Sequence, residues 1–282
     1  YFLIVVICFT SVAHAEEYWQ QDVQYIINAE LDTDAHIIRG FQQLVYTNNS
    51  PDTLVQVFFH LYQNAYTKDS YYDIVQRKRF STQIQRLSPA EEAGTEIHYI
   101  QDDRDNPYEY TIDNTILRID LSEPLVPGEQ LTFRIKFETR YGAIRRRMKR
   151  EGYTYIGAHW YPRIAVYDAE RGWNRDQHLG MEFYGDFGTF EVNLTFPEHF
   201  IVGATGVLQN RDQVLPPSLM AKLDIRNFKE KPWGESPSVI IPPSDRLKTW
   251  RYRAENVHDF AFIASPDFRI GTAEWDGIEI YS

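Results

Sequence analysis

The feature that most constrains this chain is an alternation of apolar and polar residues with a period of two. Its clearest instance is 131–138, LTFRIKFE, where the alternation runs without a break. Successive side chains of a strand point to opposite faces, so this period predicts a strand with one buried face. The same reasoning predicts further strands at 23–31, 37–46, 54–61, 96–100, 116–121, 190–196, 250–254 and 259–264. Helical periodicity is confined to 70–80 and 217–228.

The fold class that follows is all-β. Aromatic residues make up 15% of the 282 residues, and such side chains suit pleated, half-buried surfaces. Many short strands with turns between them predict a large twisted antiparallel sheet or a β-sandwich. The turns at 32–34 and 48–52 predict that the first three strands form a meander. Residues 210–248 are rich in proline and break the pattern, which indicates a long excursion between two strands.

The first residues indicate a targeting signal. Tyr1–Val12 is apolar and is followed by Ala13-His14-Ala15, which is typical of a cleavage site. We therefore expect residues 1–15 to be a signal peptide, truncated at its start, and the mature chain to be exported to the periplasm, the outside of the cell or the cell surface. A clipped membrane anchor is the alternative. After Ala15 no segment is apolar enough to cross a membrane.

Composition limits the classes of partner and ligand that the chain can bind. Cys8, the only cysteine, lies in the signal, so the mature chain has no disulfide and no thiol ligand. The formal net charge of −11 argues against a nucleic-acid partner. The one basic run, RRRMKR at 145–150, is typical of a solvated loop tip; an acidic partner or anionic lipid headgroups are the alternatives.

No complete catalytic constellation is present in the sequence. It contains no His-Glu-x-x-His, no Gly-x-Ser-x-Gly elbow and no phosphate-binding glycine loop. His178 and Glu182 are four residues apart but have no evident third ligand, and His159 could also be a ligand. We interpret these as ordinary surface or loop side chains and expect no metal in this segment.

The densest mixture of residue types lies at 157–186, where aromatics, Pro, Gly and charges occur without periodicity. Such a segment either seals one end of a sheet or lines a binding surface, and the residues alone leave both readings open.

The order of motifs in this segment resembles the N-terminal domain of the aminopeptidase N (membrane alanyl aminopeptidase) family of zinc metallopeptidases. The motifs are Trp160-Tyr161-Pro162, Tyr167-Asp168, Gly172-Trp173 and Glu182-Phe183-Tyr184, followed by the strand 190–197 and the Ala-Thr-Gly turn at 204–206. The resemblance covers nearly all of residues 16–282.

The resemblance implies a saddle-shaped all-β domain at 16–282, with the long loop at 210–248. It also implies a thermolysin-like catalytic domain beyond residue 282, which would carry the zinc and its general base. This segment would then need no cofactor, and it would not be catalytic by itself. Its partners would be the catalytic domain and a peptide substrate, whose N-terminal residue the full protein would release. Gly180-Met181-Glu182-Phe183 is similar to the family's Gly-x-Met-Glu-Asn strand only superficially, and that role is not transferred.

Within this framework we expect Tyr161 and Glu182, with His159 and Trp160 beside them, to lie near the substrate. A carboxylate such as that of Glu182 can pair with a peptide's ammonium group. In the isolated domain the side chains of the segment 160–182 should be partly exposed. The alternative function is a non-catalytic secreted β-sandwich module that binds protein or carbohydrate through an aromatic face of Trp160, Tyr161 and Trp173. A hydrolase complete in itself is a third reading.

Overall fold

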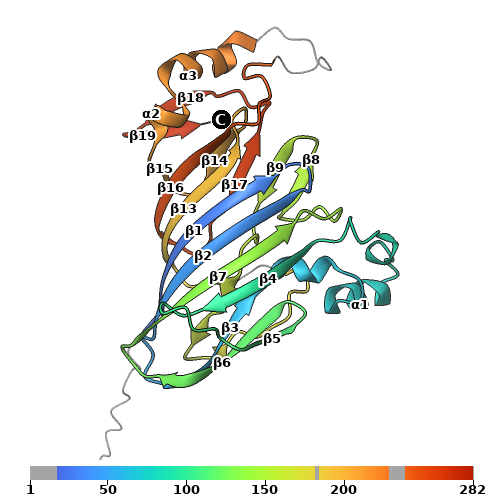
Figure 1. The fold of residues 1–282 in the computed structure, drawn as a ribbon, viewed down its shortest axis with the longest axis vertical. Helices are drawn as coiled ribbons and strands as arrows, with labels where there is room; N and C mark the ends of the chain where they lie inside the picture. The colour runs from blue at the N-terminus through green and yellow to red at the C-terminus, as the bar shows by residue number, and fades with distance from the viewer. Residues whose placement is uncertain (1–17, 182–183, 229–238, 282) are drawn as a thin grey trace, which may run out of the picture.

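A computed structural model describes residues 18–181, 184–228 and 239–281. Its centre is a seven-stranded sheet in the order β15-β16-β13-β1-β2-β7-β4, which runs the length of the molecule (Figure 1). In that order the strands are Val207–Leu208, Leu247–Val257, Gly188–Pro197, Asp22–Asp32, Ile37–Thr47, Gln130–Arg140 and Gly94–Gln101. The all-β class is therefore confirmed.

The apolar and polar residues that alternate in the sequence correspond to buried and more exposed side chains in the structure. Along β1 and β7 every second side chain is buried, and Phe133, Ile135 and Phe137 are fully enclosed. The intervening side chains lie on the other face, where most are exposed or half-buried. One face of the sheet is thus built for packing and the other for contact with water.

One pairing in the large sheet departs from the expected antiparallel arrangement. β1 runs parallel to β13, from the pair Gln24–Thr189 to the pair Glu30–Thr195, while the other neighbours in the sheet are antiparallel. The sheet is therefore mixed. β13 follows a long crossover through the smaller sheets, and such a crossover, unlike a hairpin, allows a strand to return in the same direction.

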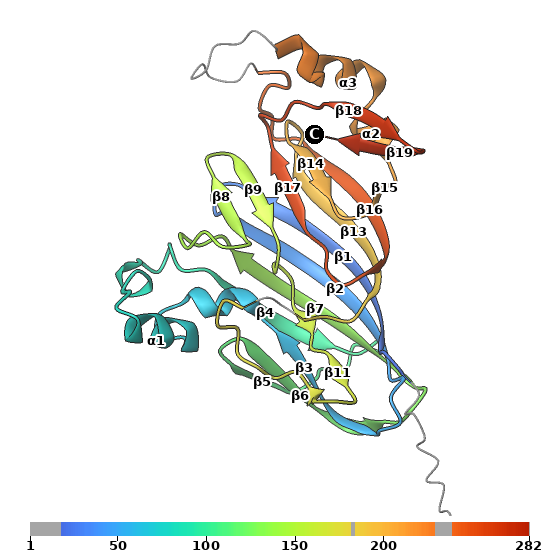
Figure 2. The same ribbon diagram turned by 180° about the vertical axis from the view of Figure 1, so that it is seen from behind.

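Smaller sheets cover one face of the large one, and they lie behind it in Figure 1 and in front of it in Figure 2. One contains β10 (Arg163–Ile164), β3 (Leu54–His60), β6 (Ile116–Leu125) and β5 (Tyr110–Asp113). Another contains β14 (Ile201–Ala204), β17 (Phe262–Ser265), β9 (Thr154–Gly157) and β8 (Lys149–Glu151). Two further sheets have two strands each. One pairs β11 (Tyr167–Asp168) with β12 (Gly172–Trp173), and the other pairs β18 (Thr272–Trp275) with β19 (Ile278–Tyr281).

The predicted three-strand meander is wrong at its third strand. β2 pairs with β7, and β3 leaves the sheet to pair with β6 and β10. The turn between β2 and β3 explains the departure, because the side-chain amide of Asn48 donates to the carbonyl oxygens of Asp52 and Leu125. Asn48 is fully buried, so these bonds fix the path of the chain into the second sheet.

Helices are short and peripheral. α1 (Tyr71–Lys78) falls within the predicted 70–80 stretch, and the Ser70 hydroxyl caps it by accepting from the Asp73 amide. α2 (Arg211–Val214) and α3 (Pro217–Leu223) lie between β15 and β16, and 3₁₀ turns occur at Tyr62–Tyr66, Ile84–Arg86 and Ile225–Phe228. Over the described residues, no helix has the length and apolar character needed to cross a membrane. Residues 1–15, where a signal peptide is predicted, lie outside the described residues.

Candidate functional site

The segment that joins β9 to β10 is buried. Trp160 is 0% exposed and Tyr161 2%, and His159 is also enclosed. The expectation that Trp160 and Tyr161 would be partly exposed is therefore wrong. The polar atoms of these two rings are satisfied inside the protein: Trp160 Nε1 donates to the Phe260 carbonyl at 3.0 Å, and the Tyr161 hydroxyl donates to Asp259 Oδ1 at 2.8 Å. The tips of the rings thus bind the connection between β16 and β17.

The same burial removes the aromatic face on which the alternative binding-module function rested. Trp160 packs edge-on against Tyr161 and Phe262, at ring-centroid distances of 5.3 and 5.6 Å. Trp173 is half-buried against Phe58 and lies 6.1 Å from the ring of Tyr46. Trp160 and Tyr161 are part of the core and Trp173 packs against it, so the three rings do not form one exposed platform for a sugar or a protein.

Arg163 ends the motif as a buried cation. Its Nη1 lies 4.0 Å from Asp259 Oδ1, and its Nη2 donates to the carbonyl of His258. Gly185 is required here, because a Cβ at that position would overlap the guanidinium group. Burial raises the pKa of the neighbouring Asp186 to about 7; the charge of Arg163 lowers it and that of Asp168 raises it further. The segment after β12 is therefore held against a buried guanidinium.

Three imidazoles gather around the ring of Tyr62. His159 stacks on it at a centroid distance of 4.3 Å, His60 stacks on it at 5.1 Å, and His178 meets it edge-on at 5.1 Å. The Tyr66 hydroxyl lies 3.3 Å from His178 Nε2. The residues come from the end of β3, the 3₁₀ turn after it, and the two loops on either side of β10–β12, so chain segments more than one hundred residues apart meet here.

Burial lowers the pKa of both His60 and His159 to about 3, with the charge of Arg163 and the other imidazoles acting in the same direction. These two rings are therefore neutral at physiological pH. His159 adopts a left-handed backbone with φ of 58°, which is uncommon outside glycine and indicates that the surrounding contacts hold it in place. In the described part of the chain, no three His, Cys, Asp or Glu side chains are grouped so that they could hold a metal ion.

A hollow of about 580 Å³ opens beside this cluster. It is lined at its base by His60, Tyr62 and His178, and along its wall by Asp168, Glu170, Arg171, Asn174, Asp176, Gln177, Leu179, Met181 and Tyr184. Three carboxylates face one arginine, so the wall is acidic. Met181 is 76% exposed, and it supplies an apolar surface next to that wall. An acidic wall with an apolar side chain beside it can receive a cationic group attached to an apolar side chain.

The predicted site residues divide between these two environments. His159 reaches the imidazole cluster, whereas Trp160 and Tyr161 belong to the core. Glu182 lies outside the described residues, although its neighbours Met181 and Tyr184 line the hollow. Sequence reasoning missed His60, which ends β3, and Tyr62, which follows it. The pattern of that strand is apolar on both faces and gives no sign of a polar surface.

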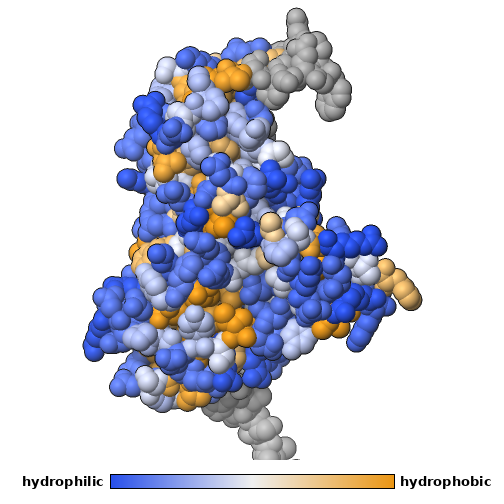
Figure 3. Space-filling view, turned by 45° about the vertical axis from the view of Figure 1, so that its right-hand side comes forward, coloured by the Kyte–Doolittle hydropathy of each residue, from blue (hydrophilic) through white to orange (hydrophobic). Residues whose placement is uncertain are grey.

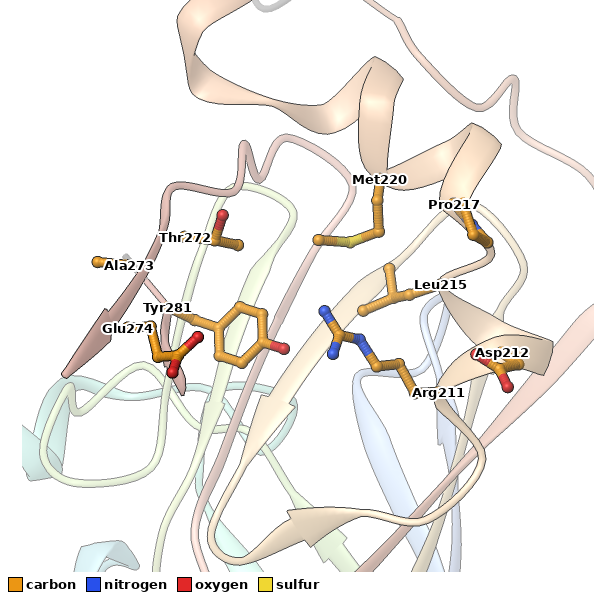
Figure 4. A pocket seen from close by; sticks show the side chains of 9 residues that line it. All are labelled: Arg211, Asp212, Leu215, Pro217, Met220, Thr272, Ala273, Glu274 and Tyr281. Carbon is orange, nitrogen blue, oxygen red and sulfur yellow. The ribbon is translucent and has the colours of Figure 1, made fainter. Parts of the chain in front are cut away.

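A second hollow, of about 630 Å³, lies at the opposite end, between α2, α3 and the β18–β19 hairpin. Figure 4 shows Arg211 and Tyr281 pointing toward one another across it, and the guanidinium carbon lies 5.5 Å from the centre of the tyrosine ring. The outer face of the hairpin is apolar and exposed, with Trp275 and Ile278 both largely in solvent. This end has the character of a docking surface rather than of a reaction site.

No protein-family model matches the chain, and no curated protein matches it. Solved structures do. One is a mutant M1 zinc metallopeptidase from Deinococcus radiodurans bound to a Tyr-Ser-Ala substrate, with a TM-score of 0.50 and 13% identity over 93% of this chain and 46% of that chain. Another is a mutant two-domain M1 zinc metallopeptidase bound to L-arginine, with a TM-score of 0.50 and 12% identity over 93% and 46%. At these identities the likeness shows the fold alone. The fold expected from the resemblance is thus confirmed, and the chain spans less than half of each matched chain.

Proposed function

We propose that this chain is the β-domain of a two-domain zinc aminopeptidase, in which it forms one wall of the substrate cleft. The observation that carries the proposal is the acidic hollow beside His60, Tyr62 and His178, found on a fold shared with M1 zinc metallopeptidases. A carboxylate-lined hollow with the apolar side chain of Met181 in its wall suits the free ammonium group and first side chain of a peptide.

In this proposal the metal belongs to the second domain, because the described residues offer no group of three ligands. Zinc bound there would polarise the scissile carbonyl and activate water. The residues of this chain would bind and orient the N-terminal residue of the peptide and would exclude water from it. The exposed apolar hairpin formed by β18 and β19 offers the second domain a further contact surface, apart from the hollow.

Within the hollow we assign the ammonium group to Asp176, and we keep Glu182, predicted from the sequence, as a second candidate. Asp168 is less suited, because its Oδ1 already accepts from the backbone amides of Glu170 and Arg171 and so shapes the loop. Asp176 is exposed at the wall of the hollow. Export through the first fifteen residues, with cleavage after Ala15, is part of the same proposal, and N-terminal sequencing of exported material would test it.

The experiment replaces Asp176→Asn and Glu182→Gln separately in the full-length protein, with Glu109→Gln, an exposed carboxylate outside the hollow, as the matched control. A charge-assisted hydrogen bond contributes about 1.5–3 kcal/mol, so loss of one should raise KM about tenfold or more while changing kcat little. Inhibition by a free amino acid should weaken by a similar factor, and inhibition by its N-acetyl form should not change. Equal inhibition constants in all three variants and the parent would refute the assignment.

A further inference from the structure

The structure joins two basic runs that lie far apart in the sequence. The first is the end of α1 with the loop after it, and the second is the connection from β7 to β8. Residues 68–92 and 143–151 together contain ten lysines and arginines and five carboxylates, in a chain whose formal net charge is −11. The two runs meet through a small core in which Ile144 packs with Tyr72 and Ile84. The Ala143 amide also donates to the Glu91 carbonyl at 2.8 Å.

Most of these cations point outward. Lys78, Arg79, Arg86, Arg145, Arg146, Arg147 and Arg150 are exposed, and we call this set the basic face. Arg145 lies 3.8 Å from a Glu151 oxygen, and Arg146 donates to the Tyr72 hydroxyl at 2.6 Å. Their positive charge is therefore held in place by the fold while it remains available to solvent.

A hollow of about 310 Å³ lies between the two runs. Its wall offers hydrogen-bond donors from both: Gln76, Ser81 and Gln83 on one side, and Arg145 and Arg146 on the other. Two guanidinium groups with hydroxyl and amide donors around a hollow of this size match the requirements of a phosphate group.

One apolar side chain stands out beside the basic face, and a second lies on the hairpin that follows the second basic run. Phe80 is 98% exposed, immediately after Arg79, and its backbone is left-handed with φ of 64°, which is costly for a bulky residue. Tyr153, at the tip of the β8–β9 hairpin, is also largely exposed. Figure 1 shows α1 and its loop projecting from the side of the sheet, and Figure 3 shows that this projection is mostly hydrophilic with an apolar group at its outer tip.

We propose that the basic face binds the surface of an anionic lipid bilayer, with a headgroup phosphate in the hollow and Phe80 inserted between headgroups. Clustered cations beside a protruding aromatic ring are the combination that holds a protein at such a surface. The convex form of the projection favours an extended surface over an acidic peptide, for which a groove would be needed. The hollow between the two basic runs shares no lining residue with the acidic hollow, so the inference does not depend on the proposed peptidase function.

The test is co-sedimentation with vesicles of phosphatidylcholine containing about one-third phosphatidylglycerol, at low and high salt. The parent should bind these vesicles and not pure phosphatidylcholine. Each cation near an anionic surface strengthens binding about fivefold, so Lys78→Gln with Arg79→Gln should weaken it roughly 30-fold. Phe80→Ser should weaken vesicle binding at both low and high salt, because the contribution of Phe80 is apolar.

The control is Arg104→Gln with Arg251→Gln, which removes the same charge from exposed positions outside the basic face. It should bind as the parent does. All variants keep the same N-terminus, so any contribution from the apolar residues 1–15 is common to them. Equal binding of the parent and the Lys78/Arg79 variant would overturn the proposal. So would binding to poly-glutamate without binding to anionic vesicles, which would indicate an acidic protein partner instead.

Discussion

Replacing Trp160 by Phe tests whether the Trp-Tyr-Pro motif is a core element. The indole is fully buried, 5.6 Å from the ring of Phe262, and its Nε1 donates to the Phe260 carbonyl. Truncation to Ala would remove on the order of 150 Å² of apolar contact, or roughly 4 kcal/mol at about 25 cal/mol per Å². The unpaired carbonyl would cost roughly 1–3 kcal/mol more. That total approaches the whole stability of a typical domain, so the milder change is the informative one.

Trp160→Phe keeps one aromatic ring but loses the donor and part of the packing. It should lower the free energy of unfolding by roughly 2–3 kcal/mol. Urea unfolding followed by far-ultraviolet circular dichroism would measure this as a lower midpoint with an unchanged slope. Trp275→Phe is the matched control, because Trp275 is 75% exposed, and it should change stability by less than about 0.5 kcal/mol. If the two variants shifted the midpoint equally, the burial argument for Trp160 would be refuted.

Two further predictions concern the same region. Gly185→Ala should destabilise the fold by at least about 2 kcal/mol, because its methyl group would overlap a buried guanidinium group. Gly203→Ala is the control and should be near neutral, because its methyl group would make only ordinary contact with Ile263 at 3.7 Å. Equal melting temperatures of the two variants would contradict the prediction. The second further prediction is that the fold is sensitive to acid. Burial lowers the pKa of His60 and His159 to about 3, whereas a histidine in the unfolded chain has a pKa of about 6.5. Below pH 6.5 the unfolded chain therefore binds more protons than the folded chain, and the free energy of unfolding falls as the pH falls. Between pH 6.5 and 5 the two imidazoles should together lower the free energy of unfolding by about 3 kcal/mol. Burial raises the pKa of Asp186 to about 7, so the fold favours its protonated form, and this carboxyl should offset the loss of stability by up to about 2 kcal/mol. A urea midpoint that does not fall between pH 7 and 5 would count against the prediction. So would an Asp186→Asn variant in which the fall is no steeper than in the parent.

The strands were predictable because a period of two is a local property of the sequence. Strand partners were not, because pairing depends on residues far away in the chain. β3 shows the difference: its residues 54–61 are clearly a strand, yet the side chain of Asn48 turns it toward β6 instead of β2. Nothing within the strand itself specifies that choice.

The candidate site shows the same limit. The motif at 157–163 was recognisable from its composition, but its burial depends on the carbonyl of Phe260 and the carboxylate of Asp259, about one hundred residues later. Trp and Tyr can be exposed or buried according to whether such a partner exists, and the sequence does not reveal the partner. The imidazole cluster likewise required the fold to bring His60, His159 and His178 together.

The parallel pairing of β1 with β13 has a consequence for biosynthesis. The first strand and its hairpin partner β2 are complete by residue 47, but the other neighbour of β1 is not complete until residue 197. At about 5–20 residues per second, ribosomes take roughly 8–30 s to make that intervening stretch. Throughout this interval β1 presents an unpaired edge, which is a template for wrong association. A nascent chain of this protein therefore depends on whatever keeps that edge covered until its second half has been made.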